Sequence, residues 1–258
     1  MKRSDEYAVK SVIKFLQLHG FEAHRMPELK KKTCDVVARY GKQHYYIEVK
    51  QRLRPIDPSY DVTVGYRSSV HKIIETAVKQ LQSMPDVKGL FRVIWFVVSE
   101  KDDRLLTKGI VNTLYGIQRI RVGRGDLELE TDCMFYNHSP FLKWPDLCLV
   151  VIQTEPGLIF CLNLNFAQAG KIKRSRIFKL PKRLDGVLDP VVAEKHGCCL
   201  IAESGHSECE KAKKTLKKYA YEWLSLVNER LFSRSRRIRL NRGASKSKCL
   251  SGGKARSA

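Results

Sequence analysis

Two strand-like segments separated by only two residues constrain the fold of this chain more than any other feature. Residues 34–40 and 43–51 are rich in Val, Ile and Tyr, which is typical of β-strands. Gly41 and Lys42 between them suit a two-residue turn with glycine at its first central position. Tyr40 then pairs with Gln43, and the same register puts Asp35 directly opposite Glu48.

This register predicts a cluster of charged side chains on one face of the hairpin. Lys50 lies two residues after Glu48, so it shares a face with Glu48 and Asp35. Two carboxylates directly opposite each other destabilise a hairpin, and a divalent cation between them would remove the repulsion. Carboxylate oxygens are ligands that suit Mg²⁺. The hairpin therefore predicts a site with two carboxylates and one ammonium group.

A third acid precedes the hairpin. Residues 5–19 are predicted to form a helix that ends at Gly20. Glu6 lies on its apolar stripe with Val9, Ile13 and Leu16, so we expect its side chain to point inward. An equally good interpretation is a first-turn glutamate that only interacts with the helix dipole.

The remaining pattern predicts an α/β protein. We expect strands at 21–26, 91–99, 127–135, 147–153, 158–165 and 198–203, and helices at 70–84, 106–120 and 208–232. The character of the sequence changes after Gly125, which suggests a first domain over 1–125 and a C-terminal α+β region over 126–232. Residues 233–258 hold almost nothing to bury, so we expect a disordered basic tail.

The net charge of +21 is concentrated in the first half of the chain and in the tail. Such a distribution favours a polyanionic partner, most often nucleic acid. No apolar run is long enough for a transmembrane helix, and the first residues, MKRSDEYAVK, lack the apolar core of a secretory signal. We therefore expect an intracellular protein, cytoplasmic or nucleoid-associated, that does not bind membranes and keeps its eight cysteines as thiols.

The order of these motifs resembles a known family. Asp35 followed by Glu48-Val49-Lys50 resembles the D…E-x-K signature of the PD-(D/E)xK nuclease superfamily. The acidic helix with Glu6, the segment from Gly20-Phe21 to Arg25, and the strand Tyr46-Ile47-Glu48-Val49-Lys50 are most similar to the archaeal-type Holliday junction resolvases, over about residues 1–100. The resemblance implies a restriction-endonuclease-like core, in which a mixed central sheet is flanked by helices.

The resemblance also implies an activity and a set of site residues. It implies a Mg²⁺-dependent endodeoxyribonuclease, with Mn²⁺ as a substitute, acting on DNA and on branched DNA first. Asp35, Glu48 and Lys50 would be catalytic, and the metal ligands would be Asp35, Glu48, the Val49 carbonyl and Glu6. A homodimer is expected by analogy with resolvases. DNA contacts, mostly to the phosphate backbone, are expected from Lys30, Lys31, Lys32, Arg52, Arg54, Arg67, Lys72, Lys79 and Gln80.

Other interpretations remain open. The C-terminal region would also fit a restriction or defence nuclease, and the same fold could serve a non-catalytic nucleic-acid-binding protein. A structural protein with an RNA-binding tail is a third class. Within residues 196–209, the cluster of His196, Cys198, Cys199, His206 and Cys209 has irregular spacing, so buried thiols are favoured over a zinc site. Trp95, Trp144 and Trp223 are expected in cores rather than on a base-stacking surface.

Overall fold

The computed structural model describes residues 3–27, 33–51, 68–98, 103–183, 186–227 and 237–239. The chain forms two compact units, and each is built from segments that are not continuous in sequence. The first unit comprises residues 1–114 and 140–189, and the second comprises residues 115–139 and 190–258.

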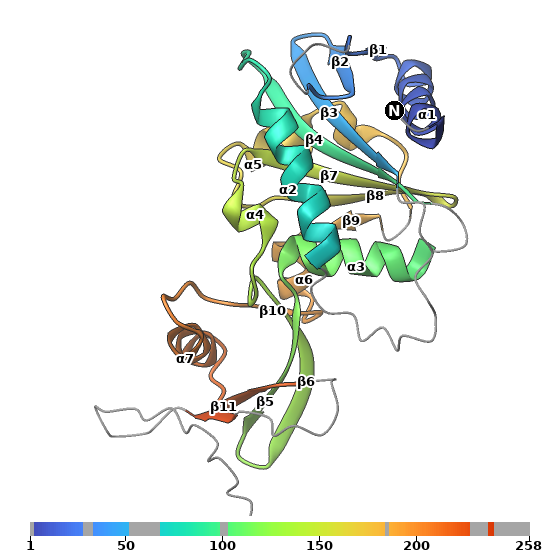
Figure 1. Cartoon of the computed structure of the whole chain (residues 1–258). Coiled ribbons are helices and arrows are strands. Elements are labelled where there is room, and N and C mark those ends of the chain that lie inside the picture. The colour runs from blue at the N-terminus through green and yellow to red at the C-terminus, as the bar shows by residue number, and fades with distance from the viewer. Residues whose placement is uncertain are drawn as a thin grey trace, which may run out of the picture. The chain divides into compact units, whose positions relative to one another are not determined.

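A seven-stranded mixed sheet forms the centre of the first unit (Figure 1). The strand order is β1-β2-β3-β4-β7-β8-β9, in which β3, β4 and β7 run parallel to one another and β8 runs parallel to β9. The other neighbouring pairs are antiparallel. The expected α/β architecture with a mixed central sheet is therefore confirmed. The strands are β1 (Glu22–Arg25), β2 (Val36–Tyr40), β3 (Gln43–Gln51), β4 (Leu90–Val97), β7 (Leu147–Thr154), β8 (Gly157–Leu162) and β9 (Val187–Leu188).

The predicted hairpin register is confirmed between β2 and β3. Tyr40 pairs with Gln43, and Val36 pairs with Ile47. Gly41 adopts a φ of 58°, the left-handed conformation that a two-residue hairpin turn requires at this position.

Helices lie on both faces of the sheet. α1 (Arg3–Leu18) packs on the face that carries the odd-numbered residues of β3, where the rings of Phe15 and Trp95 are 5.9 Å apart. α2 (Ser68–Gln82) packs on the other face, because its Gln80 reaches Lys50. The remaining helices of this unit are α3 (Asp103–Tyr115), α4 (Pro140–Lys143), α5 (Ala169–Arg174) and the 3₁₀ turn η2 (Ile177–Lys179). Among the described residues, no helix combines the length and the apolar character needed to cross a membrane.

The expected domain boundary near residue 125 does not match the two units. Residues 140–189 belong to the first unit, because β7 pairs with β4 in the middle of the large sheet. β7 is buried on both faces, as is usual for a strand in the parallel part of a sheet. A boundary at 125 would leave β4 without this neighbour.

The second unit contains a five-stranded sheet in the order β10-β6-β5-β11-β12. A small core of Ile120, Val122, Cys133, Leu216 and Leu224 joins this sheet to α7. The elements are β5 (Gln118–Arg124), β6 (Leu127–Met134), α6 (Pro190–Lys195), β10 (Leu200–Ile201), α7 (Glu208–Lys218), β11 (Trp223–Leu226) and β12 (Arg237–Arg239).

Both long helices predicted near this unit end early. The helix expected over 106–120 ends at Tyr115, because Gly116 turns the chain with a φ of 57° and β5 follows. The helix expected over 208–232 ends at Lys218, where Ala220 has a φ of 57° and the chain continues into β11. Apolar residues at helical spacing continued past both ends, and pairing in the sheet overrode that pattern.

Part of the expected disordered tail is ordered. Residues 237–239 form β12, whose backbone pairs with β11 from Trp223 to Ser225. Without this partner β11 would be an edge strand with unpaired backbone groups. The rest of residues 233–258 lies outside the described residues.

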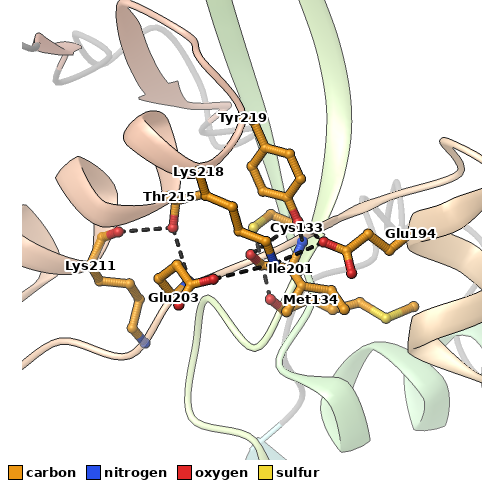
Figure 2. A network of polar contacts seen from close by, with 9 residues as sticks. All are labelled: Cys133, Met134, Glu194, Ile201, Glu203, Lys211, Thr215, Lys218 and Tyr219. Atoms are coloured by element: carbon orange, nitrogen blue, oxygen red, sulfur yellow. Dashed lines mark hydrogen bonds and ion pairs between the residues drawn. The ribbon is translucent and has the colours of Figure 1, made fainter.

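A polar network ties α7 to the rest of the second unit (Figure 2). The Tyr219 hydroxyl donates a hydrogen bond to Glu194 and accepts one of 2.7 Å from the backbone N–H of Ile201. Lys218 lies 2.8 Å from Glu194 and 3.2 Å from Glu203. The network therefore links α7 to both α6 and the segment around β10.

Candidate functional site

The hairpin brings Asp35 and Glu48 together as predicted. Asp35 directly precedes β2, and continuing the register from the pair Val36–Ile47 places it opposite Glu48. The backbone N–H of Val49 donates a hydrogen bond of 2.9 Å to Asp35 Oδ2. This contact fixes the Asp35 carboxylate beside β3, just beyond the end of the β2–β3 ladder.

Glu48 is completely buried, although it carries a carboxyl group. Its Oε1 forms an ion pair and hydrogen bond with Lys50 Nζ. Its Oε2 is buried and receives no hydrogen bond from a donor among the described residues. A buried carboxylate oxygen without a donor is unfavourable, so Glu48 needs either a proton or a cation at this atom.

The two carboxyl groups differ in proton affinity. Burial is the largest effect on Glu48 and raises its pKa from the usual 4.5 to about 8, Lys50 opposes this rise, and Asp35 adds to it. Burial also raises the pKa of Asp35, but the Val49 N–H, Lys50 and a hydrogen bond with Glu48 all lower it. Without a cation, Glu48 is therefore the more readily protonated of the two carboxyl groups.

Lys50 is held between β3 and α2. Its side chain is 24% exposed, and its ammonium group is bonded to Glu48. Gln80 Oε1 accepts a hydrogen bond of 3.4 Å from Lys50 Nζ, and Gln80 Nε2 donates one of 3.4 Å to the Thr33 carbonyl. Gln80, which is also expected to contact DNA, connects the lysine to the segment that leads into Asp35.

Glu6 lies apart from this cluster. Its side chain is 44% exposed and forms an ion pair of 2.9 Å with Lys10, one turn further along α1. The expectation that Glu6 points inward is therefore wrong, because its carboxylate reaches an exposed lysine instead. Arg25 is close enough to lower the pKa of both Glu6 and Asp35, so it connects the two electrostatically.

The basic residues expected to contact DNA are only partly visible. Lys72 and Lys79 lie on the exposed side of α2, where Lys79 forms an ion pair of 3.3 Å with Glu75. The remaining predicted contacts lie outside the described residues, namely Lys30, Lys31, Lys32, Arg52, Arg54 and Arg67.

The other candidate sites are part of the cores or dispersed. Trp95, Trp144 and Trp223 are buried, in agreement with the expectation that they pack in cores. Within the cysteine and histidine cluster, Cys199 is buried while His196, Cys198 and His206 are exposed. In the described part of the chain, no group of three or more His, Cys, Asp or Glu side chains gathers in a metal-binding arrangement.

Sequence reasoning missed two contributors to the site. Arg25 and Thr33 flank the Asp35 segment, one as a charge and the other through its carbonyl. The position of Arg25 at the end of β1, paired with Val36, could have indicated its proximity to Asp35.

Comparisons with known proteins add no independent assignment. No protein-family model, curated protein or solved structure matches the chain.

Proposed function

We propose that this protein is a metal-dependent endonuclease that hydrolyses phosphodiester bonds in DNA. The observation that carries the proposal is Glu48, a fully buried carboxyl group with one oxygen lacking a donor, opposite Asp35 and bonded to Lys50. A purely structural hairpin gains nothing from this arrangement, because the burial destabilises it.

The donor set fits a hard divalent cation such as Mg²⁺ or Mn²⁺. Asp35, Glu48 and the Val49 carbonyl would hold the ion. The N–H and C=O of one residue point to the same neighbouring strand, so the Val49 carbonyl is on the side of Asp35. When bound, the ion polarises the phosphoryl group and lowers the pKa of the attacking water. A cation would also satisfy the Glu48 oxygen and displace the proton that burial favours on Glu48.

Lys50 would orient the attacking water or stabilise the charge that develops on the phosphate. Its side chain is partly exposed to solvent, which is the side from which a phosphate would approach. Gln80 restricts where this group can lie, because it binds Lys50 from α2 and is itself bonded to Thr33. Gln80 is thus a positioning residue in this proposal.

The net charge of +21 supports a polyanionic substrate. Branched DNA and a homodimeric enzyme are the finer form of the proposal, and both come from the resemblance of residues 1–100 to resolvases.

A cleavage assay tests the proposal. A four-way junction, a linear duplex, single-stranded DNA and RNA are incubated with the protein in Mg²⁺, Mn²⁺ or EDTA. We expect metal-dependent cutting of DNA that D35N and K50A both reduce at least 100-fold, while E128Q at an exposed position of the second unit cuts like the wild type. The preferred DNA distinguishes a junction resolvase from a restriction or defence nuclease. Tight DNA binding without cutting, unchanged in D35N, would leave a binding protein and reject the catalytic proposal.

A further inference from the structure

The segment between β8 and β9 carries a concentration of positive charge far from the carboxylates. Residues 156–184 contain seven basic side chains, all between Lys171 and Arg183, and no acidic side chain. Elsewhere in residues 126–230, eight basic side chains stand against fourteen acidic ones, so the excess of positive charge in this region is confined to this segment. It follows the part of the chain that resembles resolvases, so the proposed site does not explain it.

The segment is fixed to the core. Ile172, Ile177 and Leu180 are buried against the same side of the large sheet as α1. Arg176 anchors the turn between α5 and η2, because its backbone N–H donates 2.9 Å to Gln43 Oε1 and its guanidinium group lies 5.1 Å from the Tyr40 ring. The basic side chains are therefore displayed on an ordered surface.

Three of the seven basic residues have no role in these internal contacts. Lys173 forms an ion pair with Asp189, and Lys182 lies 4.7 Å from the ring of Phe178. The exposed residues without an ion-pair partner in the described structure are Lys171, Arg174 and Lys179, which we name the α5–η2 basic surface. Lys171 and Arg174 are three positions apart on α5 and so lie on one side of the helix.

Several lysines of the second unit are paired with acidic side chains of the same unit. On α7, Lys214 pairs with Glu210 at 2.9 Å, and Lys218 lies between Glu194 and Glu203. Residues 163–184, which carry the α5–η2 basic surface, contain no acidic residue; Asp185 follows them, and Asp189 pairs with Lys173. Its charge is available to an external anion.

The chemistry of this surface favours nucleic acid over a lipid membrane. A helix that binds a membrane surface needs an exposed apolar face to insert among the lipids. Here Ile172 and Ile177 are fully buried in the core, and the exposed positions of α5 and η2 include Lys171, Arg174 and Lys179. Basic side chains on an ordered surface whose isoleucines point into the core suit the phosphate backbone.

We propose that the α5–η2 basic surface binds the phosphate backbone of a second part of the nucleic-acid substrate. Arg176 contacts Gln43 at the turn end of the hairpin, whereas Glu48 lies five residues further along β3, about 17 Å away at ~3.3 Å per residue. The surface lies on the α1 side of the sheet, and Glu48 faces the α2 side. One straight duplex on the α2 side does not reach it, so this contact suits a bent or branched substrate. The inference rests on the proposed function for the choice of DNA.

The test measures DNA binding without cleavage. The full chain is titrated with a four-way junction and with a linear duplex in EDTA, between 50 and 200 mM salt. The variant K171A/R174A/K179A removes the surface, and R124A/K195A/K217A removes the same types and number of exposed charges from the second unit. On the junction, the binding constant of the wild type decreases with salt, and a plot of its logarithm against log salt has a negative slope. In the first variant this slope should be less steep by about 2.7, or 0.9 per lost phosphate contact. Over this range the wild type then loses about 40-fold more affinity than the variant.

Two results would overturn the inference. One is a junction slope that K171A/R174A/K179A leaves unchanged, or that the control variant lowers equally. The other is loss of binding to vesicles of 30% phosphatidylserine with no change on DNA, which would identify a membrane surface. If the slope falls as expected but no DNA is cut in Mg²⁺, the proposed activity fails and the binding surface stands. If DNA is cut and the slope is unchanged, only this inference fails.

Discussion

Replacing the buried carboxyl group should make the protein more stable while abolishing its proposed activity. In E48Q the amide oxygen can still accept from Lys50, and a neutral NH₂ group replaces the buried oxygen that lacks a donor. The amide has no charge to lose or gain. The variant therefore removes the free-energy penalty of ionising Glu48 inside the protein and keeps its shape.

The size and pH range of the effect follow from the pKa of Glu48. Burial raises this pKa from 4.5 to about 8, and at 1.36 kcal/mol per unit the penalty reaches at most about 5 kcal/mol. In the unfolded chain Glu48 loses its proton near pH 4.5, whereas in the folded chain it keeps the proton until about pH 8. Wild-type stability should therefore fall between these pH values. The advantage of E48Q should grow from less than about 1 kcal/mol at pH 5 to its maximum above pH 8.

Urea unfolding in EDTA at pH 5 and pH 8.5 measures this difference. In a W223F background, fluorescence reports the first unit through Trp95 and Trp144. Saturating Mg²⁺ at pH 8.5 should stabilise the wild type, by about 2.7 kcal/mol at 100 times its Kd, and leave E48Q unchanged. The control E75Q should show no gain at pH 8.5, because the hydrogen bond from Lys79 lowers the pKa of Glu75. An E48Q protein no more stable than wild type at pH 8.5 would refute the reasoning.

Three further substitutions test the packing and polar contacts. In G123A the new Cβ would lie 2.6 Å from Trp223 Nε1, so we expect a loss of about 1–3 kcal/mol in the free energy of unfolding of the second unit, measured by urea titration. N163A removes a buried amide that donates to three backbone carbonyls, the nearest at 2.7 Å. The free energy of unfolding should fall by about 3 kcal/mol in a urea titration, and a fall of less than about 1 kcal/mol would contradict this role. Y219F removes the hydroxyl that joins Glu194 to Ile201, and should speed amide hydrogen exchange at Ile201 by about tenfold, whereas unchanged exchange would show that the hydroxyl is dispensable.

The proposed site could be predicted because its geometry is local. Asp35 and Glu48 are brought together by one two-residue turn, so the register follows from Gly41 and Lys42 alone. Gln80 was identified, but not its contact with Lys50, because the packing of α2 on β3 depends on residues 30 positions apart. The position of Glu6 was predicted wrongly for a related reason: the helical stripe does not show that Lys10, one turn away, holds its carboxylate near solvent.

The organisation of the chain was harder to predict because it depends on distant pairings. The apolar spacing predicted helices that continue beyond Gly116 and beyond Lys218. In the structure the helices end at Tyr115 and Lys218, because the residues that follow pair as strands. Gly123 illustrates the missing information. It belongs to no glycine-rich motif, and its small size is explained only by the Trp223 ring that lies against it.

The strands of the large sheet are not consecutive in sequence, and this has a consequence during synthesis on the ribosome. β4 ends at Val97 and its partner β7 begins only at Leu147, after the segment that builds β5 and β6. At a translation rate of about 5–20 residues per second, β7 is therefore synthesised about 3–10 s after β4. During this interval the apolar strand, with Ile94 and Phe96 on one side and Val93 and Trp95 on the other, is a nascent edge open to non-native pairing. Translation speed between residues 98 and 147 should thus influence how much of the newly made protein reaches its folded state.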